Sequence, residues 1–123
     1  MQENNEIYFS ENAKMQANLC YHIELNKTYE FMVESNYFSG RTTFCFHVDD
    51  LKKIIDKLNA MSMHLSGECV INDADSNNFL KVYFTEQRIK VEGLFGDFDE
   101  QSLKFAFYAD QTILRLLSSF FSK

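Results

Sequence analysis

Two short Cys-x-His motifs are the residues of this chain whose types and spacing could do chemistry. Cys20 and His22 lie in one segment that alternates polar and apolar residues, and Cys45 and His47 lie in another. Residues i and i+2 of a strand point to the same face, so neighbouring strands in register would gather the ligand set of a structural zinc site. On a flat sheet, however, such side chains stand about 7 Å apart, farther than tetrahedral zinc ligands prefer. We therefore expect half-buried thiols and surface imidazoles here.

Two further patterns could carry chemistry, and both are incomplete. A cysteine nucleophile needs a thiol pKa lowered by a helix N-terminus or a nearby cation, and no Cys begins a predicted helix. Asp73, Asp75 and Asn77 place oxygens at alternate positions, as a calcium loop does, but the Gly and Glu that complete such a loop are replaced by Asn78 and Phe84. We therefore expect no catalytic residue, no cofactor and no bound metal.

The composition predicts one compact, β-rich domain over residues 1–123. Hydrophobic residues make up 46% of the chain, and 13 Phe and 6 Tyr put much of the core volume into rings, which suit half-buried pleated surfaces. Three cysteines without a CxxC pair favour a reducing compartment over a disulfide framework. No basic leader precedes an apolar run, and no stretch reaches the roughly 18 apolar residues of a membrane helix. We expect a soluble cytoplasmic protein without membrane contact.

The charge balance gives an expectation about partners. The chain has 18 acidic and 12 basic residues, a formal net charge of -6. Nucleic-acid phosphates select basic patches, so we expect no nucleic-acid partner. A basic protein is the favoured partner, although an acidic surface also serves solubility alone.

Periodicity predicts two helices set among several strands. A helix to about residue 63 should follow an N-cap at Asp49 or Asp50, and a second should follow an Asp110 cap. A tight turn at Asn26-Lys27 should join the first long hairpin. Alternating strand patterns occupy 7–9, 19–25, 29–33, 43–48, 68–71, 80–85, 89–95 and 103–107. The predicted fold class is α+β, a single, mostly antiparallel sheet of about six to eight strands with the two amphipathic helices covering one face.

The sheet face left open by the helices should carry the contact residues. Tyr83 and Tyr108 are the predicted aromatic anchors, because rigid aromatic residues dominate interface energetics. Acidic side chains outside the covered face should speed encounter with a basic partner. These are Asp73, Asp75, Glu92, Asp97, Asp99 and Glu100.

Several short motifs occur in a characteristic order between Phe38 and Phe120. They are Phe38-Ser39-Gly40 before a strand, Val48-Asp49-Asp50-Leu51 into a helix ending near Leu65-Ser66-Gly67-Glu68, Asn78-Phe79-Leu80, Ile89-Lys90-Val91-Glu92-Gly93, and Asp110-Gln111-Thr112 before the last helix. In this order and spacing the chain resembles the WapI-like bacterial immunity proteins, small intracellular domains of polymorphic toxin systems. Family members usually carry Trp after the Ser-Gly, and this chain has no Trp.

The resemblance implies a function without catalysis. Family members whose roles are understood bind and block a cognate toxin, often a nuclease, and no catalytic residues come with the family. Two other classes stay open. One is a small-ligand-binding or enzymatic α+β domain that uses the Cys/His face, which stoichiometric zinc in the purified protein would favour. The other is a self-associating structural module.

Overall fold

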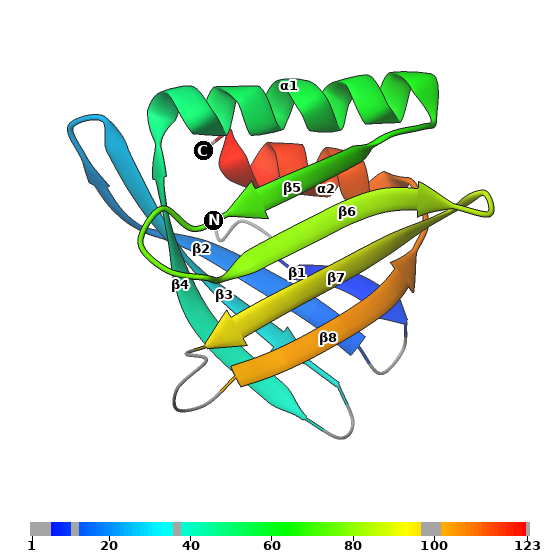
Figure 1. Ribbon diagram of the computed structural model, residues 1–123, viewed down its shortest axis with the longest axis horizontal. Helices are drawn as coiled ribbons and strands as arrows, with labels where there is room; N and C mark the ends of the chain where they lie inside the picture. The colour runs from blue at the N-terminus through cyan, green and yellow to red at the C-terminus, as the bar shows by residue number, and fades with distance from the viewer. Residues whose placement is uncertain (1–5, 11–12, 36–37, 97–101, 123) are drawn as a thin grey trace.

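The computed structural model describes residues 6–10, 13–35, 38–96 and 102–122 (Figure 1). The strands of the first half are β1 (Glu6–Ser10), β2 (Ala13–Ile23), β3 (Asn26–Glu34) and β4 (Ser39–His47), followed by α1 (Val48–His64). Those of the second half are β5 (Glu68–Asn72), β6 (Phe79–Thr85), β7 (Arg88–Gly96) and β8 (Ser102–Ala109), followed by α2 (Thr112–Phe121). Among the described residues, neither helix is long and apolar enough to cross a membrane.

The strands form two antiparallel sheets, with strand orders β1-β2-β3-β4 and β5-β6-β7-β8. The α+β class is confirmed, and the prediction of a single sheet of six to eight strands is wrong. The reason is the place of α1 in the chain. Its 17 residues leave directly from the end of β4 and carry the chain about 25 Å away before β5 begins, so β5 starts a new sheet. The alternation of polar and apolar residues predicts which face of the sheet each side chain points to, but it does not predict which strand lies beside it.

An aromatic core joins the two sheets to α2. Phe31 and Phe44 of the first sheet lie 5.0 Å apart by ring centroids, and Phe44 lies 5.8 Å from Phe95 of the second sheet. Phe121 at the end of α2 lies 6.0 Å from Phe31. The helices pack against each other along one side of the sheet pair (Figure 1). Each sheet therefore turns one face inward and leaves the other open, so the molecule has two uncovered faces where one was predicted.

Each helix begins beside a side chain that accepts from a backbone N–H of its first turn, and the N-cap residues of both differ from the prediction. For α1 the cap is His47, whose Nδ1 accepts from the backbone N–H of Asp49 at 3.1 Å, so Asp49 and Asp50 lie inside the first turn. There they still lie at the positive end of the helix dipole. For α2 the N-cap position is Gln111, one residue later than predicted, and its side chain makes no cap hydrogen bond; Oδ1 of Asp110 nevertheless accepts from the N–H of Thr112, the first helical residue, at 2.8 Å.

A bulge in β2 reverses its two faces. Leu19 pairs with Tyr29, but Tyr21 pairs with Thr28, so one residue of β2 is extra. Since Tyr29 points into the core, Tyr21 points to the opposite, outer face together with Thr28. The turn that follows lies at Glu24 and Leu25, two residues earlier than predicted.

The bulge also separates the two Cys-x-His motifs. His22 pairs with Lys27, on the face opposite to that of Cys45, which pairs with Thr28. Among the described residues, no group of three or more His, Cys, Asp or Glu side chains is arranged to hold a metal ion. The geometric premise of the zinc and Cys/His alternatives, four side chains on one face, is thus not met.

Candidate binding surfaces

The outer face of the β5–β8 sheet holds three of the predicted contact residues. Strand pairing places Tyr83, Lys90 and Tyr108 in one row across β6, β7 and β8. Glu92 lies in the next row, between Lys81 and Ala106. The structure thus brings Tyr83, Glu92 and Tyr108 together on one face, as the alternation of the three strands predicts.

Hydrogen bonds and an ion pair fix Tyr83 and Glu92 against each other. The hydroxyl of Tyr83 donates to Oε1 of Glu92 at 2.7 Å, and Nζ of Lys90 lies 3.3 Å from the same oxygen. The hydrogen bond from Tyr83 is the main reason why the pKa of Glu92 lies below its ordinary value and the pKa of Tyr83 above its own. The charge of Glu92 is therefore compensated within the face.

Tyr108 is the more accessible of the two tyrosines. Its side chain is 45% exposed, and two cations stand over its ring: Cζ of Arg88 lies 4.4 Å from the centroid and Nζ of Lys90 lies 5.7 Å from it. Such contacts hold the ring in place while leaving an edge open to a partner. Tyr108 lies on β8, the last strand of its sheet, which also contacts β1 of the other sheet.

The outer face of the β5–β8 sheet is cationic although the chain is acidic. Strand pairing assigns two carboxylates to it, Glu68 and Glu92. It assigns four cations: Lys81, Arg88, Lys90 and Lys104. Four positive charges minus two negative charges leave +2, against -6 for the whole chain. The acidity therefore resides elsewhere on the molecule.

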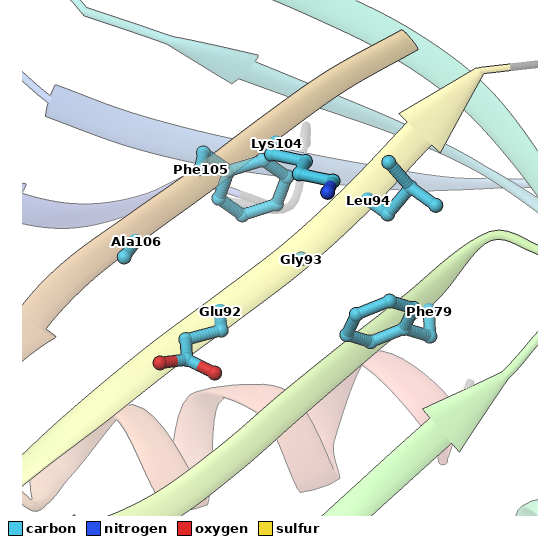
Figure 2. Close-up of a pocket in the computed structure, with 7 residues that line it drawn as sticks. All are labelled: Phe79, Glu92, Gly93, Leu94, Lys104, Phe105 and Ala106. Carbon is cyan, nitrogen blue, oxygen red and sulfur yellow. The ribbon is translucent and has the colours of Figure 1, made fainter. Parts of the chain in front are cut away.

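A hollow of about 540 Å³ opens on this face beside the tyrosine row. Figure 2 shows its lining residues: Phe79, Glu92, Gly93, Leu94, Lys104, Phe105 and Ala106. Gly93 has no side chain because Phe105 needs the space: a Cβ there would lie 2.3 Å from the Phe105 ring. Because Gly93 pairs with the buried Phe105, the space that it leaves lies on the core side of the sheet and is filled by that ring.

The predicted acidic residues are not gathered around this face. Asp73 is only 9% exposed, and its Oδ1 accepts from the N–H of Cys45 at 2.8 Å and from the N–H of Asp75 at 3.2 Å. Its carboxylate therefore ties the β5–β6 loop to β4 and is largely occupied. Asp75 is exposed in the same loop. Asp97, Asp99 and Glu100 lie outside the described residues.

The tip of the β2–β3 hairpin is a second surface, which sequence reasoning missed. We call residues 19–26 the finger, because Figure 1 shows the hairpin tip projecting beyond the rest of the molecule. Large apolar side chains cover it: Leu19 is 40% exposed, Tyr21 64%, Ile23 65% and Leu25 57%. Simple alternation assigns these four residues to the covered face. The bulge moves Tyr21 and Ile23 to the outer face, and it has no signal in the sequence; Leu19 precedes the bulge, and Leu25 lies in the turn.

Comparison with protein-family models gave no match, and the comparisons with curated proteins and with solved structures gave none either. The likeness to WapI-like immunity proteins therefore stands on the order and spacing of the motifs alone.

Proposed function

We propose that the protein is a non-enzymatic domain that binds another protein, with the finger as a principal contact. The observation that carries this proposal is the exposure of the finger: Tyr21 and Ile23 are 64% and 65% exposed. A contiguous apolar patch on a soluble domain marks an interaction site more often than it serves the fold. The finger residues contribute little to the core, which is built from the opposite end of the hairpin.

The partner that fits best is a cognate bacterial toxin, blocked by binding in the cytoplasm. Two observations support this choice: the motif order shared with WapI-like immunity proteins, and a net charge of -6, which complements a basic enzyme cleft. Tyr83 and Tyr108 form a second contact surface on the outer face of the β5–β8 sheet; because this face is cationic, it would meet an acidic part of the toxin and not its basic cleft. Asp75, Asp97, Asp99 and Glu100 contribute long-range attraction.

Binding kinetics with the purified product of the adjacent reading frame test this proposal. The double variant Tyr21→Ser/Ile23→Ser should speed dissociation by about tenfold or more, because apolar anchors act mainly on the dissociation rate. Tyr8→Ser is the matched control, since Tyr8 is 62% exposed on β1 and lies outside the finger. Association of the wild-type protein should slow as salt is raised.

Two results would contradict the proposal. Equal dissociation rates for the double variant and for Tyr8→Ser would show that the finger is not part of the interface. A wild-type dimer in analytical ultracentrifugation that the double variant converts to a monomer would assign the finger to self-association. The protein would then be the structural module described above.

A further inference from the structure

The hollow on the outer face of the β5–β8 sheet has an apolar floor that a solvent-facing sheet surface does not ordinarily have. Leu94 pairs with Phe79 on one side and with Lys104 on the other, so its side chain points outward, yet it is only 2% exposed. The Cβ of Ala106 and the bare backbone of Gly93 continue the floor toward Glu92 (Figure 2). Leu94 itself is covered, so a ligand entering here would meet mainly the half-buried ring of Phe79 and the exposed methyl group of Ala106.

The two charged side chains of the hollow differ in their partners. Glu92 is compensated, because it accepts from Tyr83 and pairs with Lys90. Lys104 reaches across from β8 toward Leu94, and within the described chain its ammonium group makes no ion pair, hydrogen bond or ring contact (Figure 2). Figure 2 also shows Glu92 at the end of the hollow away from the Lys104 ammonium group. Among the described residues that line the hollow, the uncompensated charge is thus the single cation of Lys104.

We propose that this hollow is a binding site for a small apolar carboxylate, whose body packs on Phe79 and Ala106 and whose carboxylate pairs with Lys104. Its volume of about 540 Å³ falls within the roughly 300–1,000 Å³ of small-molecule sites. One lysine offers one point charge, which suits a monoanion better than a phosphate group. The hollow opens on the same face as Tyr83 and Tyr108, but the carboxylate site depends on the lining of the hollow alone and does not rest on the proposed protein partner.

Three soluble probes of one shape test the inference: 4-phenylbutyrate, 4-phenylbutanol and 4-phenylbutylamine. Each is titrated at pH 7 into the ¹⁵N-labelled full chain, and amide shifts are followed by NMR. The carboxylate should bind most tightly and the amine most weakly, with shifts concentrated at residues 92–94 and 104–106. Lys104→Met should lower the affinity for the carboxylate by about fivefold, the equivalent of about 1 kcal/mol for a partly desolvated ion pair. It should leave the affinity for the alcohol unchanged.

Two further variants keep the result interpretable. Lys81→Met removes a cation from the same face outside the hollow and should not alter the affinity for the carboxylate. Ala106→Phe fills the hollow from an exposed strand position and should abolish binding of all three probes without unfolding the protein. Equal affinities for the alcohol and the carboxylate, equal effects of Lys104→Met and Lys81→Met, or shifts that map elsewhere would each overturn the inference.

Discussion

Asn78 connects the two sheets through one buried amide. Its Nδ2 donates to Oγ1 of Thr42 at 2.7 Å and to the carbonyl of Thr43 at 3.3 Å, both on β4. Its Oδ1 accepts from the N–H of Gly96 on β7 at 2.9 Å. Only 4% of the residue is exposed, so a lost partner is not replaced freely by water.

We predict that Asn78→Ala lowers the free energy of unfolding by about 2–4 kcal/mol, because it leaves buried donors and acceptors unpaired. The neighbouring Asn77 is exposed and serves as the control: Asn77→Ala should change stability by no more than about 0.5 kcal/mol. Urea denaturation at constant m-value measures both. Similar small effects for the two variants would show that the amide does not hold the sheets together.

Asp110 gives a prediction that depends on pH. Hydrogen bonds from the hydroxyl and the N–H of Thr112 hold the pKa of this carboxyl below its ordinary value of 3.8. A group whose pKa is lower in the folded state stabilises the fold above its unfolded pKa, and the contribution disappears as the pH falls through the folded pKa. Asp110→Ala should therefore lose about 1 kcal/mol at pH 7. The difference from the wild type should shrink below pH 3.8, and a constant difference in urea titrations down to the acid transition would contradict this origin.

At the scale of elements, the β6–β7 hairpin turns through two residues that fit their conformation poorly. Glu86 and Gln87 have φ of 49° and 67°, the left-handed region that a two-residue type I′ turn requires and that non-glycine residues adopt at a cost. Glu86→Asn with Gln87→Gly should raise the free energy of unfolding by about 1–2 kcal/mol. Glu86→Ala with Gln87→Ala removes the same side chains but keeps both Cβ atoms, so thermal unfolding should show no gain for that control.

Helices and strands differ in how far the sequence predicts them. The 3.6-residue period predicts a buried face of the first helix at Leu51, Ile54, Ile55, Leu58, Met61 and Leu65. The structure buries Leu51, Ile54, Leu58 and Met61 and half-buries Ile55, because the period fixes a buried face without reference to any other element, whereas Leu65 lies at the C-cap and is 55% exposed. The finger shows the opposite case. One extra residue after Leu19 exchanges the two faces of a strand, and nothing in the local composition marks it.

At the scale of the whole molecule, each half has the same order, four antiparallel strands followed by a helix, and the halves share one core. Leu58 of α1 and Leu117 of α2 are both 0% exposed in that core. We predict that Leu58→Ala and Leu117→Ala each cost about 2–5 kcal/mol and that each shifts a single transition. Far-ultraviolet and near-ultraviolet circular dichroism should give coincident curves for both variants. Two separate transitions would show that the halves unfold independently.

The candidate surfaces were predictable where they depend on one strand and its hairpin partner. Tyr83, Glu92 and Tyr108 share a face, as alternation indicates. The hollow could not be foreseen, because it needs the register that sets Phe79, Leu94 and Lys104 side by side across three strands. The structural role of Asp73 likewise depends on a contact with β4, 28 residues away in sequence. Neither composition nor periodicity predicts which distant segments of the chain pair with each other.

Because Cys69 is buried, the rate at which its thiol reacts measures how often the structure around it opens. This thiol lies on β5, which packs against α1, is only 4% exposed, and has a pKa raised to about 11 by burial, whereas Cys20 is exposed. At neutral pH an alkylating reagent should therefore modify Cys20 at once and reach Cys69 only when the contact between α1 and β5 breaks. The labelling rate of Cys69, followed by mass spectrometry under native conditions, then reports how often that layer separates, without any denaturant.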